Sequence, residues 1–513
     1  MKKIFLGIAI FGLTLSATLS FSQKKTALPA EFSLKKSDVE ANMRFLAGDE
    51  LMGRRTGEQG NLVAARYIAE QFRKLGVKPV PSQAGSGVIS NNAYYQNVAF
   101  EKMSAPGSGE IIANAQTLKS GQDWILMSGK ATDITAPLIY ASYGLENADK
   151  GWDDYKGLDV KGKIVLIQSG TQDVQTPSEI IASSAEKRKL AAEKGAIAVI
   201  ELFTAPIPWN VVNKFFGVEK MGLADLDKKS LPDIPHAWVN GKDANLTRSL
   251  RGVTEVKFKT TGRKSQLVNS YNVVGYIEGT DPKLKEEYIL LSAHYDHIGV
   301  GKQGGQDYTP EDSIFNGARD NAFGTVALLA AAESFTKNPP KRSVLIVALT
   351  AEEVGLLGSK YYAAHPLLPL NKCIFNNNSD GAGYNDTTIV SIIGLERTGA
   401  RVEIEKAAKA FGLGVFAEPS PEQGLFDRSD NVNFAKEGVP APTFSPGFKE
   451  FAGDMLKNYH QVSDNPETID FNYLLKFCQS FTYASRLIAD RAIAPQWIKG
   501  DKYEEAGKKL YGK

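Results

Sequence analysis

The sequence predicts an α/β protein in which a mixed central sheet carries helices on both faces and a smaller, β-rich α/β domain is inserted. Two observations predict this class. From Asn269 onward, apolar strands alternate with amphipathic helices, a pattern typical of a sheet covered on both faces. Before that point, residues 136–258 form a strand-rich stretch with no cluster of His, Asp or Glu at ligand spacing. The chain is also long enough for more than one domain.

Two helices followed by loops are expected before residue 136. Between residues 37 and 80, apolar residues recur every three or four positions, which is the helical period, and Gly76 is expected to end the second helix. A polar, glycine-rich loop at residues 48–57 separates the two helices. Residues 81–130 combine Gly, Ser and Asn with short alternating runs, so we expect loops and edge strands there.

The inserted stretch is expected to contain short strands and a helix. Strands are predicted at residues 137–143, 164–168 and 195–200, and a helix at residues 185–194. Since it has no ligand-type cluster, we interpret this stretch as a lid without chemistry of its own.

The C-terminal half is expected to form the main sheet. Apolar strands are predicted at residues 288–293, 343–350 and 373–375, and the clearest helices at residues 321–335 and 471–492. In open α/β sheets, functional groups gather at the carboxyl ends of the strands. The residues that follow these strands are therefore the first candidates for a site.

The composition argues against two classes of function. The 513 residues include 60 Lys and Arg against 58 Asp and Glu, so there is no basic excess to neutralise a nucleic acid. Mean hydropathy is slightly negative, which argues against a multi-span membrane protein. The two cysteines, Cys373 and Cys478, stand in apolar contexts and are interpreted as core residues.

An export signal is predicted at the N-terminus. Lys2 and Lys3 precede an apolar run over residues 4–21, and small residues lead to an expected cleavage site after Ser22. The alternative is a membrane anchor, but Gly, Thr and Ser residues interrupt the run and no charged stop-transfer block follows it. We therefore expect an exported chain, periplasmic or secreted, with no transmembrane span once residues 1–22 are removed.

Potential metal ligands follow each expected strand of the C-terminal half. His294 follows the first strand, Glu352 and Glu353 follow the second, and Asp380 follows the third. Two adjacent acids directly after a wholly apolar strand are unusual for a solvated loop. Asp380 has a structural alternative as a turn residue.

Two more candidates stand before helices. Asp320 precedes the helix expected from residue 321, where it could instead act as a cap, and His460 precedes the last long helix. Imidazoles together with carboxylates are a donor set that suits zinc. Even two histidines and three of these four carboxylates are too many for one tetrahedral ion with an open position, but they suit two ions that share a carboxylate.

Taken in order, these motifs resemble the M28 family of zinc aminopeptidases and carboxypeptidases, with a protease-associated (PA) domain inserted. The motifs are His-x-Asp from residue 294, Gly-Ala-x-Asp-Asn from 317, Ala-Glu-Glu-x-Gly-Leu-x-Gly-Ser from 351, Asp380, and Tyr-His at 459–460. The resemblance starts with Leu-Ala-Gly-Asp-Glu-Leu-Met-Gly-Arg at 46–54 and reaches the final helix. It implies a zinc exopeptidase-like fold in which, after the expected signal peptide at 1–22, peptidase-domain segments lie at 23–135 and 259–513 and a PA insertion lies at 136–258.

The resemblance also implies a ligand set for two zinc ions. Asp320 would bridge the ions. His294 and Asp380 would complete one ion, and Glu353 and His460 would complete the other.

Three further residues receive catalytic roles by the same resemblance. Glu352 would be the general base that activates a metal-bridging water. Asp296 would accept the ring N–H of His294 and fix its tautomer. Tyr459 would donate to the oxygen of the attacked carbonyl, although packing alone is its structural alternative.

The other histidines receive structural interpretations. His297 is expected to form local hydrogen bonds, with a swapped ligand role beside His294 left open. His236 and His365 stand next to prolines and are interpreted as structural or surface residues.

Three positions depart from the common pattern of the family. Asn431 stands where many relatives have His, and Phe323 stands where a small residue is usual, which predicts a narrower pocket or altered helix packing. Residues 376–379 are unusually polar for the end of a core strand. None of these departures removes an expected ligand.

The resemblance therefore implies an exported di-zinc exopeptidase acting on peptides, with aminopeptidase activity as the leading interpretation. Two alternatives remain open. One is a glutaminyl cyclase-like enzyme with a single zinc, and the other is a non-catalytic receptor or binding module of the same fold.

Overall fold

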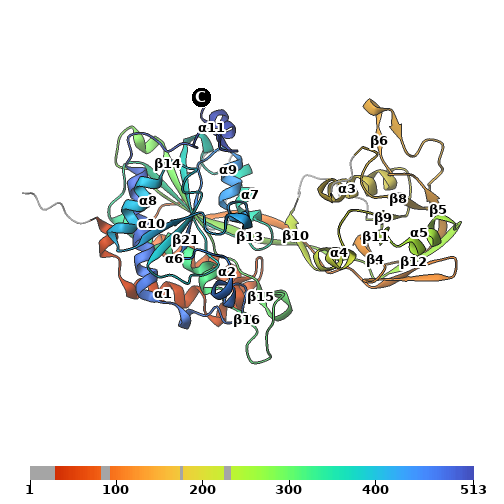
Figure 1. The fold of residues 1–513 in the computed structure, drawn as a ribbon, viewed down its shortest axis with the longest axis horizontal. Helices are drawn as coiled ribbons and strands as arrows, with labels where there is room; N and C mark the ends of the chain where they lie inside the picture. The colour runs from red at the N-terminus through yellow and green to blue at the C-terminus, as the bar shows by residue number, and fades with distance from the viewer. Residues whose placement is uncertain (1–28, 82–92, 174–176, 225–232, 513) are drawn as a thin grey trace, which may run out of the picture.

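The computed structural model describes residues 29–81, 93–173, 177–224 and 233–512. The predicted α/β class is confirmed: a larger body and a smaller body are each built on a sheet with helices, and extended strands join them (Figure 1). The expected signal peptide lies outside the described residues. Within the described ranges, no helix is long and apolar enough to cross a membrane.

The larger body is built on a nine-stranded mixed sheet. In spatial order its strands are β10 (Lys220–Leu223), β1 (Tyr95–Met103), β13 (Ser265–Ile277), β17 (Ser343–Leu349), β14 (Tyr288–His294), β18 (Cys373–Ser379), β21 (Thr443–Pro446), β19 (Ile389–Ile393) and β20 (Gly414–Ala417). The central strand β14 runs parallel to both of its neighbours, β17 and β18. Their carboxyl ends therefore meet at one edge of the sheet.

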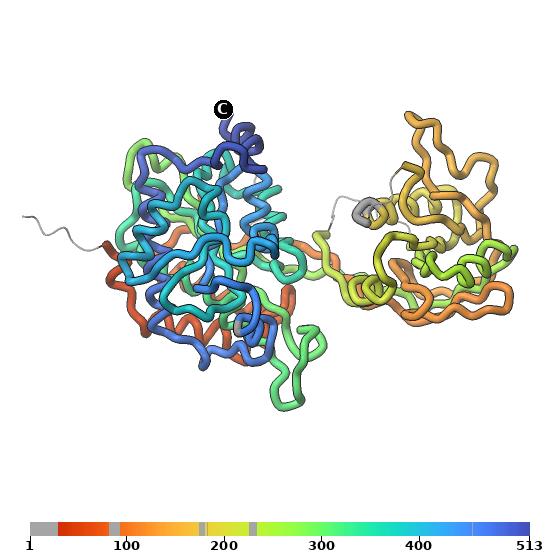
Figure 2. Tube along the Cα trace, in the orientation of Figure 1, coloured from red at the N-terminus to blue at the C-terminus, as the bar shows by residue number. Residues whose placement is uncertain are grey.

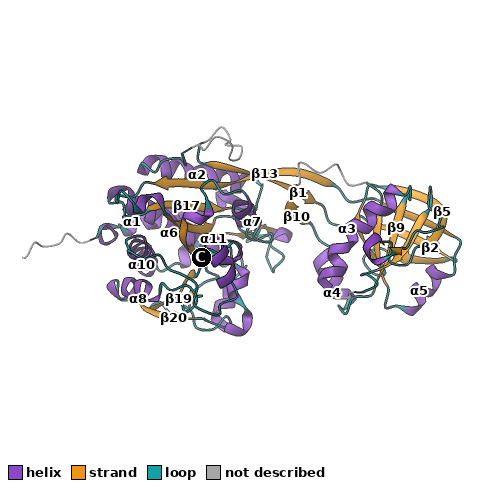
Figure 3. Ribbon diagram, turned by 90° about the horizontal axis from the view of Figure 1, so that it is seen from above, coloured by secondary structure: helices purple, strands orange, loops and turns teal. Residues whose placement is uncertain are grey.

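Helices cover both faces of this sheet, as Figure 3 shows from above. One face carries α1 (Lys36–Leu46), α2 (Gln59–Leu75), α6 (Phe323–Lys337), α8 (Arg401–Ala410) and α10 (Phe471–Ala489), and the other carries α7 (Leu357–Ala364), α9 (Asn431–Lys436) and α11 (Glu504–Tyr511). Because strand side chains alternate, Ile289 and Leu291 pack into the first core while Leu290 packs into the second. A strand buried on both faces must be apolar throughout, which explains the unbroken hydrophobic runs.

The smaller body is built on an eight-stranded sheet. In spatial order its strands are β3 (Gln116–Lys119), β2 (Gly109–Ala113), β12 (Glu255–Thr260), β5 (Thr132–Tyr140), β8 (Ile164–Gln168), β9 (Ala198–Phe203), β11 (His236–Asn240) and β4 (Trp124–Ser128). Its helices are α3 (Pro177–Glu193), α4 (Trp209–Phe216) and α5 (Ala244–Arg251). The sheet starts at Gly109, earlier than the predicted boundary at residue 136, because β2, β3 and β4 pair with strands of the insertion and not with the larger sheet.

The insertion interrupts a pair of antiparallel strands. The chain leaves the larger sheet at Met103 in β1 and returns at Ser265 in β13, and these two residues are partners in the ladder. Figure 2 shows the intervening segment as a separate body at the end of this pair. Within the segment, β10 turns back and pairs with β1, so the insertion adds an edge strand to the larger sheet. Two short pairs, β6 (Glu146–Asn147) with β7 (Trp152–Asp153) and β15 (Gly299–Val300) with β16 (Ile314–Phe315), complete the strands.

The polar residues 376–379 belong to β18 and are fully buried. Their side chains join a hydrogen-bond network: Ser292 Oγ lies within hydrogen-bond distance of Asn376 Oδ1 and Asn378 Oδ1, and Asn378 Nδ2 donates to Ser429 Oγ. Hydrogen bonds of this kind offset part of the cost of burying polar side chains. This part of the strand therefore ties the centre of the sheet to the loop around residue 429.

Candidate active site

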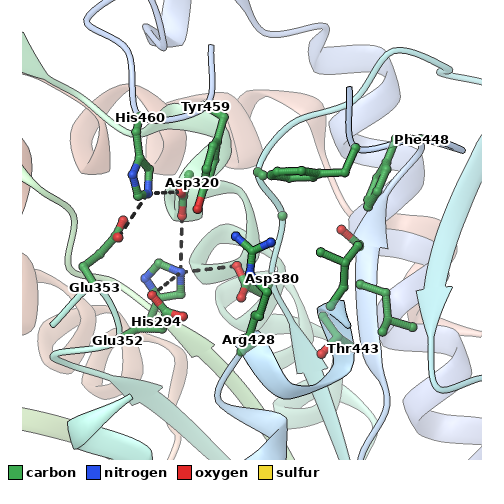
Figure 4. A pocket seen from close by; sticks show the side chains of 17 residues that line it. His294, Asp320, Glu352, Glu353, Asp380, Arg428, Thr443, Phe448, Tyr459 and His460 are labelled. Atoms are coloured by element: carbon green, nitrogen blue, oxygen red, sulfur yellow. Dashed lines mark hydrogen bonds and ion pairs between the residues drawn. The ribbon is translucent and has the colours of Figure 1, made fainter. Parts of the chain in front are cut away.

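Three neighbouring parallel strands deliver the candidate residues to one edge of the sheet. His294 is the last residue of β14 and pairs with Leu349 at the end of β17. Glu352 and Glu353 follow β17 in the next turn, and Asp380 follows β18 directly. Figure 4 shows that these side chains converge on one pocket. The expectation that strand ends would bring these residues together is therefore met.

Asp320 lies between two histidines. Residues 318–322 form an irregular turn in which Asp320 has non-helical backbone angles, and α6 begins only at Phe323. Asn321, not Asp320, accepts the hydrogen bond from Gly324 N. The carboxylate of Asp320 instead has Oδ1 at 3.4 Å from His294 Nε2 and Oδ2 at 3.2 Å from His460 Nε2 (Figure 4). Capping therefore does not account for this residue.

The candidate ligands form two clusters that share this edge. In each cluster the ligand atoms lie within 4.8 Å of one another: His294, Glu352 and Asp380 form one, and His297, Asp320, Glu353 and His460 form the other. The distance from His294 Nε2 to Asp380 Oδ1 is 3.3 Å, and that from His460 Nε2 to Glu353 Oε2 is 3.1 Å. Nitrogen and carboxylate donors gathered at this spacing are the donor set that zinc sites use.

His297 is buried beside the second cluster. Its Nδ1 lies 2.7 Å from Glu353 Oε1, so it forms the local hydrogen bond expected of it, and it is also close enough to the cluster to serve as a ligand. The two remaining histidines lie elsewhere. His365 is exposed at the end of α7, and His236 is buried in the sheet of the smaller body.

Asp296 organises the turn that carries the two glutamates. Its carboxylate accepts hydrogen bonds from Glu352 N at 3.1 Å, from Glu353 N at 3.4 Å and from Thr56 Oγ1 at 2.9 Å. The carboxylate of Asp296 was expected to accept the ring N–H of His294, but the backbone oxygen of Asp296 is closer. Nδ1 of His294 is 3.2 Å from that backbone oxygen and 3.7 Å from the carboxylate. The backbone oxygen of Asp296 thus faces the imidazole, and its carboxylate fixes the glutamate turn.

Arg54 received no role from the sequence, although it ends the motif at residues 46–54. The side chain is buried and donates to Tyr295 O at 2.8 Å, Asn316 O at 2.5 Å, Gly317 O at 3.0 Å and also Leu46 O. Burial lowers the pKa of its guanidinium to about 10, while nearby carboxylates counteract this. Arg54 therefore fastens α1 to the loops that carry His294 and Asp320.

Asp464 holds the turn around Asp320 from the other side. Its carboxylate accepts from Arg319 Nη1 at 2.8 Å and from Arg319 N at 2.9 Å, and Asp320 N lies 3.3 Å from it. Its position four residues after His460 is the only local signal in the sequence. Such contacts between distant segments leave little trace in hydrophobic periodicity.

The two adjacent glutamates have opposite pKa shifts. Burial, with the nearby charges of Asp380 and Glu353, raises the pKa of Glu352 well above its usual range. Burial would also raise the pKa of Glu353, but His460 and the hydrogen bond from His297 lower it to about 2. Two carboxyls whose environments separate their pKa values are suited to different roles, one exchanging protons and the other remaining an anion.

The remaining pocket wall comes from β19, β21 and the loops near them. Tyr459 lines this wall, and burial raises the pKa of its hydroxyl, which keeps it a neutral donor. Asp430 is buried behind the pocket, and burial raises its pKa to about 7. None of the three family departures lines the pocket: Phe323 packs on Phe477, Asn431 donates to the backbone of residue 441, and residues 376–379 lie within β18. The effect of Phe323 is therefore on helix packing and not on pocket width.

Comparisons with known proteins point to the same class. Residues 272–484 match peptidase family M28, and residues 134–245 match the PA domain. Aminopeptidase YwaD of Bacillus subtilis (strain 168) is 26% identical over 524 aligned residues, which cover 97% of each chain. Leucine aminopeptidase 2 of Trichophyton equinum is 26% identical over 432 residues, covering 76% of each chain. The structure of an aminopeptidase from Aneurinibacillus sp. strain AM-1 has a similar fold, with a TM-score of 0.52 at 21% identity, covering 91% of this chain and 96% of that one.

The chain is thus an M28 aminopeptidase-like zinc metallopeptidase with an inserted PA domain. The M28 match extends across the sheet edge from His294 to His460, so both clusters lie inside the matched domain. The PA match lies within the inserted segment between Met103 and Ser265. The family resemblance predicted from the motifs is confirmed.

Proposed function

We propose that this protein is an exported aminopeptidase that uses two zinc ions to release N-terminal residues from peptides. The observation that carries the proposal is the position of Asp320, which presents one carboxylate oxygen to each of two histidines. A carboxylate between two nitrogen donors is the arrangement expected of a bridging ligand in a two-metal site. His294 and Asp380 would complete one ion, and Glu353 and His460 the other.

The charges at the site fit two divalent cations. Asp320, Glu352, Glu353 and Asp380 all line the pocket, so carboxylates outnumber the imidazoles. Buried carboxylates at such short spacing repel one another unless cations or protons compensate them. A single ion would leave much of this charge unbalanced, which favours the two-ion proposal over the cyclase-like alternative.

When bound, zinc ions would lower the pKa of a water and polarise the peptide carbonyl. Glu352 would take a proton from the attacking water and deliver it to the leaving amine, for which its raised pKa is suited. Tyr459 would donate a hydrogen bond to the carbonyl oxygen as negative charge develops there. Asp296 and Thr56 would keep Glu352 in place through the turn they hold.

The relatives support the choice of an aminopeptidase. Both curated relatives described above are named aminopeptidases, and one of them aligns along nearly the whole chain. Export is proposed from the N-terminal sequence, because Lys2 and Lys3 precede an apolar run that ends at small residues. Intact mass of the protein recovered outside the cytoplasm would show whether residues 1–22 are removed.

The test compares two adjacent glutamates. We expect Glu352→Gln to keep the zinc content of the native protein but to reduce kcat on leucine p-nitroanilide by roughly 10²- to 10⁴-fold, the usual contribution of a general base. Glu353→Gln should lose both zinc and turnover, since this residue is proposed as a ligand. Zinc per chain is measured by inductively coupled plasma mass spectrometry on protein that lacks residues 1–22.

The outcomes separate the three candidate functions. Two zinc ions per chain with chelator-sensitive release of N-terminal residues supports the proposal. One zinc ion with cyclisation of N-terminal glutamine would indicate the glutaminyl cyclase alternative. A folded native protein with neither zinc nor turnover would indicate a binding module.

A further inference from the structure

The pocket extends beyond the proposed ligands into a wall of different chemistry. This wall combines apolar side chains with two hydroxyls: Ile393, Leu425, Thr443, Ser445, Phe448 and Phe451. In Figure 4, Thr443 and Phe448 face the cavity from the side opposite His460 and Glu353. A substrate group next to the scissile bond would therefore contact this wall.

Arg428 is the one Lys or Arg among the residues that line this pocket. Figure 4 shows its guanidinium directed into the cavity between Asp380 and Tyr459. The guanidinium lies over the ring of Phe451, 5.5 Å from the centroid. Stacking on an aromatic ring holds the plane of a guanidinium in a defined orientation while leaving its N–H groups free to donate.

The donors of Arg428 have no assigned partner. Its side chain is exposed, and it makes no hydrogen bond or ion pair with any residue in the described part of the chain. The neighbouring Asp380 instead faces His294. The two other arginines near the site have hydrogen-bond partners: Arg54 donates to backbone oxygens, and Arg319 donates to Asp464. Arg428 is therefore the cation that remains available to a ligand.

We propose that Arg428 binds a carboxylate of the substrate and so directs the enzyme to peptides that carry a carboxylate next to the scissile bond. A guanidinium fork matches a carboxylate through two parallel hydrogen bonds. That carboxylate has two possible sources, the acidic side chain of an N-terminal Glu or Asp and the free carboxyl end of a dipeptide. This inference rests on the proposed aminopeptidase function and specifies its substrate class.

The experiment uses two matched substrate pairs. Glutamate p-nitroanilide is compared with leucine p-nitroanilide for the side-chain source, and the dipeptide Leu-Gly with its C-terminal amide for the terminal source. We expect Arg428→Gln to lower the ratio of kcat/KM within one of these pairs by roughly 10- to 100-fold, the effect of losing a charge-assisted hydrogen bond. Arg428→Lys should restore only part of the ratio, because an ammonium cannot form the bidentate fork.

The pair that responds identifies the source of the carboxylate. Arg401→Gln is the matched control, since Arg401 is half-exposed on α8, pairs with Glu405 at 2.8 Å and does not line the pocket. An equal loss on all four substrates, or no change in either ratio, would overturn the proposal, because carboxylate recognition must discriminate within a pair.

Failure of the proposed function has a different signature. If the native protein hydrolyses none of the four substrates, the aminopeptidase proposal fails, and calorimetric binding of glutamate against leucinamide then tests Arg428 alone. Tighter binding of glutamate by the native protein that Arg428→Gln abolishes would support carboxylate recognition. Equal binding of both compounds by native protein and variant would rule it out.

Discussion

At the scale of single residues, the site depends on where one carboxylate points. Asp320 faces His294 with Oδ1 and His460 with Oδ2, whereas Asp380 faces His294 alone. This asymmetry follows from the fold. Asp380 follows β18 directly, while Asp320 lies in a turn that Asp464 holds between the two clusters. If Asp320 bridges two ions, the two aspartates should differ in how much metal they retain.

The zinc content of the corresponding variants tests the bridging role of Asp320, which their activity alone cannot do. We expect about two zinc ions in the native protein, about one in Asp380→Asn and less than one in Asp320→Asn, because the bridging ligand serves both ions. Zinc per chain is measured after dialysis against a buffer of fixed free zinc. Equal zinc content in the two variants would contradict a bridging role for Asp320.

At the scale of elements, the sequence predicted what periodicity can detect. The strands that end at His294 and Leu349 were predicted within one residue, because fully buried parallel strands are continuous apolar runs. The last part of β18 could not be found this way, since buried residues 376–379 are polar and some of their hydrogen bonds are made with distant hydroxyls. The pairing of β2–β4 with the smaller sheet was missed for the same reason, because pairing partners are not encoded locally.

The same distinction between local patterns and contacts with distant segments applies to the candidate site. The proposed ligands stand in short motifs beside strand ends, so the place where they meet could be predicted. Arg54 ends the motif at residues 46–54, but most of its partners are distant in the sequence, as are those of Asp464, and no local pattern marks Asp464 or Arg428. The meeting of the Asp296 backbone oxygen with His294 likewise depends on loop geometry that spacing does not determine.

In the smaller body, three elements meet at a buried ionic network. Glu201 on β9 accepts from His236 Nε2 on β11 at 2.9 Å, from Ser184 Oγ at 2.8 Å and from Lys187 Nζ on α3 at 3.1 Å. Burial would raise the pKa of Glu201, but the hydrogen bond from His236 and the charge of Lys187 lower it to about 2. The ionised carboxylate is therefore preferred in the folded state.

This network should make the smaller body sensitive to acid. Because the folded pKa of Glu201 lies below its ordinary value, its contribution is present above about pH 4.5 and is lost as pH falls towards 2. Glu201→Gln should therefore lower the melting temperature strongly at pH 6, where the ionised carboxylate contributes roughly 3 kcal/mol to the free energy of unfolding. The decrease should be much smaller at pH 3. Scanning calorimetry across this range measures the difference, with exposed Glu193→Gln on α3 as the control. A destabilisation that does not depend on pH would contradict this assignment.

At the scale of the whole molecule, the residues of the candidate active site lie outside the inserted segment. Every residue that lines the candidate pocket comes from positions 294–460, and none comes from the segment between Met103 and Ser265. The insertion does support the larger body, since β10 pairs with β1 and packs Met221 and Leu223 against Val98. It should therefore contribute stability to the peptidase domain without contributing to the reaction on small substrates.

Excising the insertion tests this separation. Because Met103 and Ser265 are ladder partners, a two-residue Asn-Gly turn can replace residues 104–264 and close β1 and β13 into a hairpin. We expect the shortened protein to bind as much zinc as the full chain and to keep a similar kcat/KM on leucine p-nitroanilide. It should melt at a lower temperature, since loss of β10 exposes apolar surface worth about 1.5–3 kcal/mol per large side chain.

A shortened protein that is folded by circular dichroism but binds no zinc would show that the insertion helps to form the metal site. If zinc is retained, the smaller body acts on substrate access or on partners, and its influence should appear only with peptides long enough to reach it.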